Sequence, residues 1–458
     1  MRASSSGVLR AVLWAVIPAG PLAAGLAARA ALAVAPAGLA TDLAQPLVVV
    51  TAWGAFGGQL FLLLAAGMAA SAAALGLLCV QAVRGGGDLA ASPRGIALCS
   101  ALGLAAALSW PCVFSSDAYA YAAYGDQLLH GQNPYRPAPP AAHDAFLDAA
   151  RWQWTRTSFP ACVYGPLFVA AGALAVGAGG AQVVPALWLL RLGACAAFLG
   201  AVLLLDASLA GSPFRRLKVA LFALNPVALW CVAEGHNDAF VVAAVLGAVV
   251  AVRRGKPALA AFLVGATPAV KAIGIVAGPP FWALLRGPTR ARFGWTFAGT
   301  ACAVALVVAP LQLSGLDGLA RHGRYAPQFS LQGLLGPVPA LVVAAAIALS
   351  ALVDLRRGRF AGAVRLALAG WLAIPNPYPW YGLWVLPLAV AGPLSWESAA
   401  LFGATISIAL RYLPEAFGDI SGIPGALVTL GELLPAVLAL PALRRPPAAA
   451  AEEATPTR

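Results

Sequence analysis

Long apolar runs, separated by short polar or basic segments, follow one another along almost the whole chain. A run of about 20 apolar residues is long enough to cross a bilayer as a helix, and a spanning segment must satisfy its own backbone hydrogen bonds. The pattern therefore predicts an all-α, polytopic membrane protein of about 14 spanning helices. The expected spans are residues 11–34, 55–82, 95–114, 183–207, 218–233, 238–252, 257–270, 272–286, 293–313, 337–354, 360–374, 380–393, 396–411 and 422–443.

Composition and charge placement agree with this class. Hydrophobic residues make up 61% of the chain and charged residues only 10%, with a mean hydropathy of +0.83, which excludes an ordinary soluble domain. The net charge of +12 does not indicate nucleic acid, because the basic residues form short clusters between apolar runs. Such clusters mark cytoplasmic loops of a plasma-membrane protein. The clusters are Arg215, Arg216 and Lys218; Arg253, Arg254 and Lys256; Arg286, Arg290 and Arg292; Arg356, Arg357 and Arg359; Arg444 and Arg445.

This charge rule fixes the expected topology. An odd number of crossings must separate an outer segment that begins at residue 115 from the basic cluster near 215, and span 183–207 supplies one. The apolar stretch 166–178 is therefore expected to be an interfacial helix on the outer face. Residues 1–445 are expected to form one membrane domain, followed by a disordered cytoplasmic tail, 446–458. The outer side then carries residues 115–165, 234–238, 314–336 and 375–381.

The first outer segment begins with SSDAYAYAAYGDQLLHGQNPY, directly after the apolar run that ends near Phe114. This places Asp117 at the membrane boundary, where a carboxylate is costly unless it is paired or used. The polar loop that we expect after it is rich in aromatic and amide side chains, which suit the flat faces and hydroxyls of sugars. An interfacial aromatic belt is the alternative explanation. These loop residues include Tyr119, Tyr121, Tyr124, Asp126, Asn133, Tyr135, Trp152, Trp154, Arg156 and Tyr164.

A second polar cluster interrupts the apolar sequence between two expected spans. Within NPVALWCVAEGHNDAF, four side chains lie together: Glu234, His236, Asn237 and Asp238. Asn or Asp alone would cap a turn, so the additional His and Glu indicate an active-site contribution. His236 with Asp238 or Asp117 could also hold a divalent metal, but so few ligands give weak support. No cofactor is assigned.

A lone cation lies in the apolar segment ATPAVKAIGI. Lys271 is the only charged residue between Lys256 and Arg286, and Pro268 and Gly274 on either side of it weaken a regular helix. Such a lysine either extends to the membrane interface or meets an anion. Binding of a phosphate is the favoured interpretation.

Two further outer segments contribute candidates. Arg321 and Arg324 in DGLARHGRYAPQFS lie in an expected outer loop, where basic residues are less common than in cytoplasmic loops. The fork of an arginine side chain matches phosphate oxygens, which makes both residues candidates for phosphate binding; a solvated loop would also explain them. Trp380 and Tyr381 in IPNPYPWYGLW are expected to line a substrate groove, unless the prolines mark only a rigid turn. Glu432, near the middle of the last expected span, has no assigned partner.

The order of these motifs resembles a known family. SSDAYAYAAYGDQLLHGQNPY, YGPLF at 164–168, LNPVALW, GHNDA at 235–239 and the segment around Lys271 are similar to the bacterial polyprenol-phosphate-mannose-dependent α-1,6-mannosyltransferases of the GT-C class. The similarity runs from about residue 115 to 280, and more loosely to 390. It implies a multi-span fold whose first long outer loop carries the catalytic acid, and a lipid-linked rather than a nucleotide-linked sugar donor.

Individual residues carry this resemblance. Asp117 matches the acidic position expected to act as base. Asn133, Tyr135 and Tyr164 match the NPY and YGPL elements, and His236, Asn237 and Asp238 match the HND element. Glu234 stands where smaller residues are usual in such proteins.

Residues and resemblance together give one hypothesis. The protein transfers a hexose, with mannose favoured, from a polyprenyl monophosphate to a hydroxyl of a glycan or glycolipid on the outer face, with inversion. Asp117 accepts the proton, Lys271 with Arg321 or Arg324 meets the phosphate, and the remaining candidates, Tyr121 among them, bind substrate. Its partners are donor, acceptor and membrane lipids, with no nucleic acid. The alternative is a multi-span transporter or lipid flippase. Such proteins typically have charged sites near the midplane, a feature that only Glu432 offers here, and inverted repeats, which we do not find.

Overall fold

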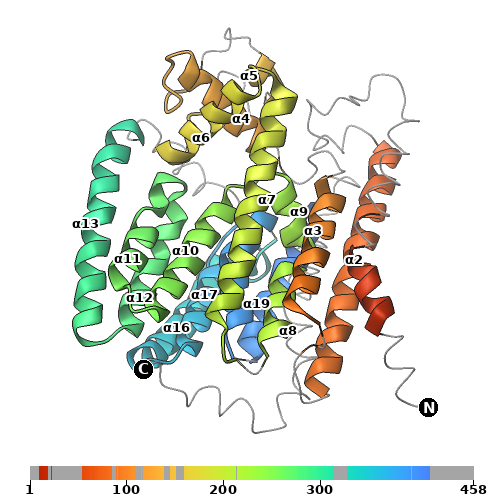
Figure 1. The fold of residues 1–458 in the computed structure, drawn as a ribbon, viewed down its shortest axis with the longest axis vertical. Coiled ribbons are helices and arrows are strands. Elements are labelled where there is room, and N and C mark those ends of the chain that lie inside the picture. Colours follow the sequence, from red (N-terminus) through yellow and green to blue (C-terminus); the bar gives the residue numbers. More distant parts are fainter. Residues whose placement is uncertain are drawn as a thin grey trace.

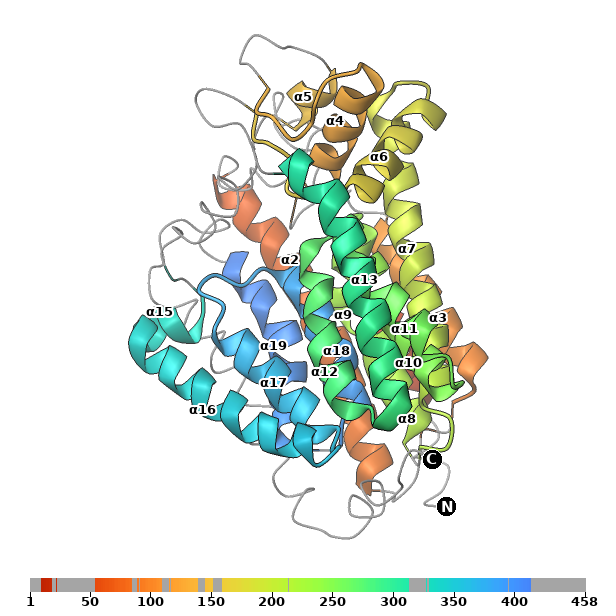
Figure 2. The same cartoon turned by 90° about the vertical axis from the view of Figure 1, so that its left-hand side faces the viewer.

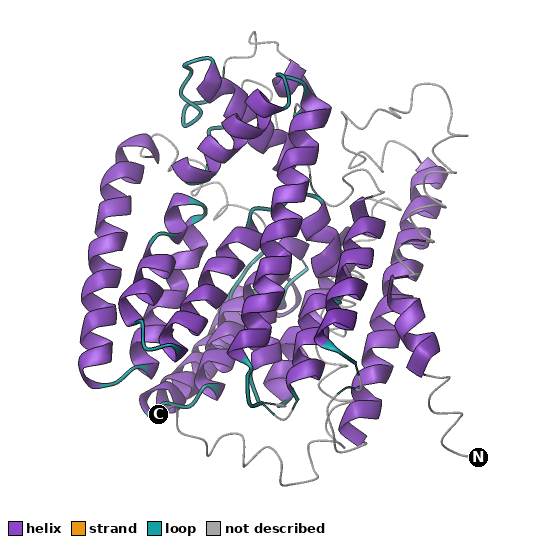
Figure 3. Cartoon of the chain, viewed as in Figure 1, coloured by secondary structure: helices purple, strands orange, loops and turns teal. Residues whose placement is uncertain are grey.

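A computed structural model describes residues 10–18, 22, 54–84, 89, 91–108, 115, 117–138, 145–150, 159–212, 214–312, 327, 329–393 and 395–412. Within these residues every regular element is a helix, which confirms the all-α class (Figure 3). The elements are α2 (Gly54–Arg84), α3 (Pro93–Leu108), α4 (Asp117–Leu129), α5 (Ala145–Ala149), α6 (Pro166–Ala178), α7 (Val183–Ser208), α8 (Arg215–Ala223), α9 (Pro226–Ala233), α10 (Asp238–Arg253), α11 (Pro257–Gly265), η3 (Thr267–Ala269), η4 (Ala272–Ala277), α12 (Gly278–Leu284), α13 (Gly287–Gln312), α15 (Leu331–Leu335), α16 (Pro337–Arg356), α17 (Ala361–Leu372), η6 (Pro379–Tyr381), α18 (Gly382–Ala391), α19 (Trp396–Ser407) and η7 (Ile408–Tyr412).

Several helices have the length and composition of membrane spans. Among the described residues four qualify, in α2, α7, α13 and α16, or five if the bent pair of α8 and α9 is one span. This supports a membrane protein but does not confirm the count of 14, because other expected spans are shorter apolar helices. Span 422–443 with Glu432, most of span 11–34, and the tail 446–458 lie outside the described residues, and the single-domain assignment remains a prediction.

The expected span 218–233 is bent rather than straight. Helices α8 and α9 meet at an angle of 47°. Pro226 disfavours a helical conformation at the residue before it, and Asn225 instead caps α9. The Asn225 Oδ1 atom accepts hydrogen bonds from the two backbone N–H groups after Pro226, at 3.1 and 3.0 Å. The Asn225 amide also donates to Thr405 Oγ1 at 2.8 Å, which ties α9 to α19.

The segment around Lys271 is broken, as its proline and glycine predict. After α11 the chain forms two short 3₁₀ helices, η3 and η4, on either side of Lys271 before α12 begins. A Cβ atom at Gly274 would lie 2.4 Å from the Thr267 side chain, so only glycine permits this close packing of η4 on η3. The break lets the lysine emerge from an otherwise apolar region.

The expected loop after Asp117 is instead helical at its start, which corrects the sequence-based prediction. Asp117 is the first residue of α4, and its backbone N–H donates to Ser115 Oγ at 3.0 Å. The Ser115 cap, together with a carboxylate in the first turn, stabilises a helix N-terminus. The alanine-rich sequence that follows continues the helix. Residues 166–178 form helix α6 as predicted, and the interfacial placement of this helix remains a prediction.

Helices α4, α5 and α6 form a cap at one end of the bundle, visible in both views (Figures 1 and 2). Helix α7, with 26 residues or about 39 Å, runs from this cap to the opposite end (Figure 1). Helix α10 also has a polar and a basic end, because it begins at Asp238 and ends at Arg253. We call the end of the bundle that carries α4, α5 and α6 the cap end, and the opposite end, where α10 ends at Arg253, the basic end.

The contact between α4 and α6 yields a testable prediction. A Cβ atom at Gly125 would lie 2.3 Å from the Gly172 backbone, so Gly125→Ala should lower the free energy of unfolding by about 1–3 kcal/mol through overpacking. The thermal unfolding midpoint of the purified protein in detergent measures this. Gly177→Ala, on the same α6 but with open space around it, is the matched control and should be neutral or slightly stabilising. Equal midpoints for both variants would contradict the close contact.

Candidate active site

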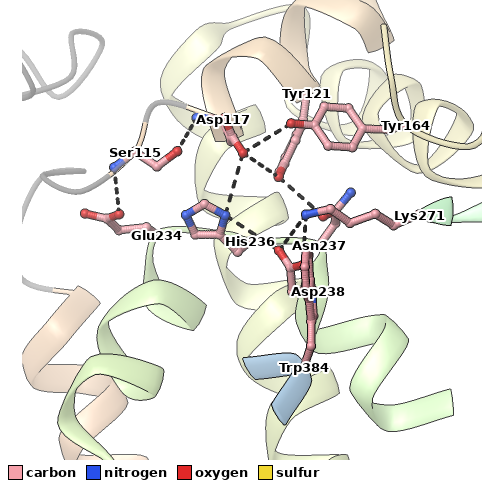
Figure 4. A network of polar contacts seen from close by, with 10 residues as sticks. All are labelled: Ser115, Asp117, Tyr121, Tyr164, Glu234, His236, Asn237, Asp238, Lys271 and Trp384. Atoms are coloured by element: carbon pink, nitrogen blue, oxygen red, sulfur yellow. Dashed lines mark hydrogen bonds and ion pairs between the residues drawn. The ribbon is translucent and has the colours of Figure 1, made fainter. Parts of the chain in front are cut away.

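The turn between α9 and α10 meets the start of α4, where a network of polar side chains forms (Figure 4). Asp117 is at its centre. Its Oδ2 atom accepts hydrogen bonds from the hydroxyls of Tyr164, at 3.1 Å, and Tyr121, at 3.4 Å. The Nδ1 atom of His236 lies 3.8 Å from the same oxygen. Tyr121 is one helical turn after Asp117 on α4, so a single helix places both side chains.

The environment of Asp117 suits a proton acceptor. Its side chain is 14% exposed, and burial is the main cause that raises the pKa of the carboxyl above its ordinary value. The charge of Lys271 opposes this shift and that of Asp238 adds to it, while the hydrogen bond from Tyr164 stabilises the ionised form. A carboxylate with a raised pKa is a stronger base than a solvated one, which is what general base catalysis requires.

Asp238 and Lys271 form a buried ion pair beside Asp117. The Asp238 side chain is 0% exposed, and Lys271 Nζ lies 2.8 and 2.9 Å from its two carboxylate oxygens. The indole N–H of Trp384 also donates to Asp238. The ammonium group lies over two aromatic rings, 5.8 Å from the Tyr164 centroid and 5.5 Å from that of Trp384. The lysine side chain keeps 15% exposure, so the cation stays accessible beside the pair.

His236 lies between the two carboxylates. Its Nδ1 atom is 3.8 Å from both Asp117 and Asp238, and its ring stacks on Trp380 at a centroid distance of 4.4 Å. Burial, with the Lys271 charge as a second cause, lowers the pKa of the imidazole well below its ordinary value. This shift favours the neutral imidazole.

Two side chains of this turn carry polar atoms that are buried and unsatisfied. Neither ring nitrogen of His236 makes a hydrogen bond within the described part of the chain, and the same holds for the Asn237 amide nitrogen. The Asn237 Oδ1 atom lies 3.4 Å from the Tyr121 hydroxyl and shares its single proton with Asp117 Oδ2. Unsatisfied polar groups of this kind are rare in folded proteins and call for a partner such as a bound ligand.

Glu234 has a different role from its neighbours. Its carboxylate accepts the backbone N–H of Ser115 and the indole N–H of Trp230, each at 3.0 Å. Figure 4 places it on the far side of His236 from Asp238 and Lys271. It thereby holds the start of α4 against the end of α9. The substrate contact that the sequence predicts for Glu234 remains a prediction.

Asn133 and Tyr135 brace the segment that carries Tyr164. The Asn133 Oδ1 atom accepts the Tyr135 backbone N–H at 2.9 Å, and the Tyr135 hydroxyl donates to the backbone oxygen of Tyr164 at 3.1 Å. The next residue, Gly165, donates its N–H to Val270 O at 2.9 Å, and a Cβ atom there would lie 2.2 Å from the backbone of η3. These contacts fix Tyr164 next to Lys271.

The structure thus brings together most of the sequence-predicted site. Tyr381 lies beside it and stacks on Trp384 at 4.2 Å. Within the described ranges, no group of three or more His, Cys, Asp or Glu side chains is arranged to hold a metal ion. Arg321 and Arg324, like Trp152, Trp154 and Arg156, lie outside the described residues. The predicted residues that meet in the network or support it directly are Asp117, Tyr121, Tyr164, His236, Asn237, Asp238, Lys271 and Trp380.

Sequence reasoning missed Trp384 and Ser115. Trp384 follows Trp380 by four residues in PWYGLW, the spacing of side chains on one helical face, and this signal could have indicated it. Ser115 opens the motif that contains Asp117 and has the residue type of a helix cap.

Comparison with known proteins places this site in a family. Residues 18–286, more than half of the chain, match the family model described as the N-terminal domain of alpha-(1->6)-mannopyranosyltransferase. This range contains both acids, the histidine and the lysine of the network. The chain belongs to the alpha-(1->6)-mannopyranosyltransferase family. This favours a transferase over a transporter.

A curated relative agrees with this assignment. Alpha-(1->6)-mannopyranosyltransferase A of Mycobacterium tuberculosis is 29% identical over 359 residues. The match spans 66% of this chain and 66% of the length of that relative. No solved structure matches the chain significantly.

The buried ion pair leads to a stability prediction. Lys271→Met leaves the Asp238 carboxylate buried without its cation, so the free energy of unfolding should fall by about 3–5 kcal/mol. The double variant Lys271→Met/Asp238→Asn removes both charges and should recover much of this loss. Denaturant unfolding in detergent of the wild type, the two single variants Lys271→Met and Asp238→Asn, and the double variant measures the coupling energy between the two charges. Additive losses would show that the two charges do not stabilise each other.

Proposed function

We propose that this protein is a membrane glycosyltransferase that moves a hexose, with mannose favoured, from a polyprenyl monophosphate to an acceptor hydroxyl. The observation that carries the proposal is that a carboxylate of raised pKa, Asp117, and a lysine cation, Lys271, both contact Tyr164, the carboxylate at its hydroxyl and the cation over its ring. A base for the attacking hydroxyl and a cation for a departing phosphate are the two groups that such a transfer needs. Family membership supports the sugar and the reaction type.

Asp117 acts as the general base. The acceptor oxygen attacks the anomeric carbon, its proton passes to the Asp117 carboxylate, and the bond from the anomeric carbon to the phosphate oxygen breaks. A single base and a single displacement give inversion at that carbon. The two tyrosine hydroxyls on Asp117 hold the carboxylate oxygen in place for the incoming proton.

Lys271 stabilises the leaving group. The donor is a phosphodiester, so the departing polyprenyl phosphate gains negative charge, and a nearby ammonium lowers the barrier to that step. The partial exposure of Lys271 gives the phosphate access to it, while Asp238 holds the cation in position until the donor arrives. Arg321 and Arg324 remain candidates for further phosphate contacts, and the lipid tail lies between helices.

The unsatisfied atoms of His236 and Asn237 bind sugar hydroxyls. A neutral imidazole offers one donor and one acceptor, and the Asn237 amide nitrogen offers two donors. Substrate hydroxyls would satisfy these buried groups and so contribute to recognition.

The reaction takes place on the extracytoplasmic face, with a glycan or glycolipid as acceptor. The arrangement of charge supports this orientation, because the network lies at the cap end of α10 whereas Arg253 and Arg254 follow at its basic end. Arg215 likewise comes after the long α7, away from the cap (Figure 1). Basic loops face the cytoplasm, so the cap end faces outward.

Replacement of the base tests the proposal. With polyprenyl-phosphate-mannose and a short α-mannan acceptor, Asp117→Asn should reduce kcat by about 10²- to 10⁴-fold, because the amide cannot accept the proton. Product is measured by transfer of labelled mannose to the acceptor.

A matched control separates chemistry from folding in this assay. Asp206→Asn removes a carboxylate that pairs with Arg215 at the basic end, at 2.6 Å, and should retain most activity. Full activity in Asp117→Asn would show that another residue is the base, and Asp238 would be the first to test. Absence of product from the wild type over a panel of donor sugars would refute the transferase.

The pH profile gives a second test. The base must be ionised, so kcat/KM should rise with pH through the pKa of Asp117, above the ordinary range of an aspartate because the group is buried. Tyr164→Phe removes a hydrogen bond that stabilises the ionised form, and the acid limb should move up by about one to two pH units, given about 1.5–3 kcal/mol for such a bond. Tyr124→Phe, whose hydroxyl donates to Pro160 O, is the control. If Tyr164→Phe leaves the acid limb of the pH profile unchanged, that limb does not arise from the ionisation of Asp117.

A further inference from the structure

A column of four stacked planar groups runs from the end of η7 to the candidate active site. The guanidinium carbon of Arg411 lies 3.7 Å from the centroid of the Tyr378 ring. Tyr378 stacks on Trp380 at 4.7 Å with an interplanar angle of 20°, and Trp380 stacks on His236 at 4.4 Å with an angle of 18°. The column therefore connects Arg411 with the imidazole that lies between the two acids.

The Arg411 end of the column is firmly held. One guanidinium nitrogen donates to Asn376 Oδ1 and to Pro377 O, both at 2.8 Å. The guanidinium also lies over the ring of Phe329 at 5.3 Å, and the residue is only 6% exposed. A planar guanidinium that stacks and hydrogen-bonds at its edge is well suited to fix an aromatic segment.

At its other end, the column contacts a ring whose nitrogens make no hydrogen bond within the described residues. A buried histidine is usually oriented by hydrogen bonds from its ring nitrogens. Neither nitrogen of His236 has such a bond within the described residues, and its 3.8 Å approaches to Asp117 and Asp238 are too long for one. Stacking of the imidazole on Trp380, with an interplanar angle of 18°, is therefore a contact that restrains the plane of the ring.

We propose that Arg411 is a positioning residue for the transfer reaction, acting through Tyr378 and Trp380 to hold His236 between Asp117 and Asp238. The inference rests on the proposed function, because it assumes that the orientation of His236 matters to substrate. Arg411 and both aromatic residues lie beyond residue 286, where the family match ends. The C-terminal part of the chain therefore orients a side chain that the N-terminal part supplies.

The kinetic test compares two stacked arginines. Arg411→Ala should lower kcat by about 10- to 100-fold with little change in KM for the donor, because misplacement of a site group mainly affects the reacting geometry. Arg290→Ala is the matched control: Arg290 lies 4.9 Å over the ring of Trp282 and donates to backbone carbonyls such as Leu285 O, away from the network. It should keep wild-type kinetics. Arg411→Lys keeps the charge without the planar fork and should regain little of kcat.

A double-mutant cycle distinguishes positioning from general stability. If Arg411 acts through His236, Arg411→Ala should cause no further loss of kcat in a His236→Ala background. Equal, additive losses in both backgrounds would overturn the inference, as would wild-type kcat in Arg411→Ala.

A spectroscopic measurement tests the column independently of activity. Arg411→Ala should shift the tryptophan emission through Trp380, and this shift should vanish in a Trp380→Phe background. Unchanged emission in Arg411→Ala would overturn the column. If the wild type transfers no sugar but the shift occurs, the proposed function fails while the column stands, so the two failures are distinguishable.

Discussion

The buried ion pair between Asp238 and Lys271 is the interaction on which the rest of the site depends. A carboxylate without any exposure is strongly unfavourable unless a cation and hydrogen-bond donors surround it, and Lys271 and Trp384 fulfil these roles. To meet Asp238, the lysine must leave a helical region, which the break between η3 and η4 allows. The same cation and anion then act on their neighbours: Lys271 favours the ionised Asp117 and the neutral His236, and Asp238 opposes the ionisation of Asp117.

Close backbone contacts hold the segments that form the site next to one another. Glycine at 165 lets the Tyr164 segment approach η3, and glycines 125 and 172 let α4 lie directly on α6. A Cβ atom at Gly165 would clash with the backbone of η3, and one at Gly125 with the backbone of α6. Irregular backbone within an apolar bundle is tolerated where it is buried in protein or lines a cavity, and here it lies where the polar groups gather.

The sequence indicated the polar residues of the site well, and their supports poorly. Asp117, the polar turn at 236–238 and Lys271 stood out because each is anomalous in an apolar surrounding, which is a local signal. The bend between α8 and α9 and the helical start at Asp117 depend on caps formed by Asn225 and Ser115, and apolar periodicity does not show caps. The stacking of Trp380 on His236 joins residues 144 positions apart (380 − 236) and is a tertiary contact that no local pattern encodes.

The side chains proposed to react and the side chains that stack against His236 therefore come from different parts of the chain. The acids, the histidine and the lysine lie within residues 18–286, as do the two tyrosines on Asp117. The aromatic rings that stack toward His236, Tyr378 and Trp380, lie beyond that range, and Arg411 stacks on Tyr378. The Asn225 bond to Thr405 also crosses this division, since it secures the helix that leads into the polar turn. The N-terminal part carries Asp117, His236, Asp238 and Lys271, whereas the ring that stacks on the imidazole, Trp380, comes from the C-terminal part. We therefore expect substitutions at Tyr378, Trp380 or Arg411 to change the rate of the proposed transfer while leaving Asp117, His236 and Lys271 in place.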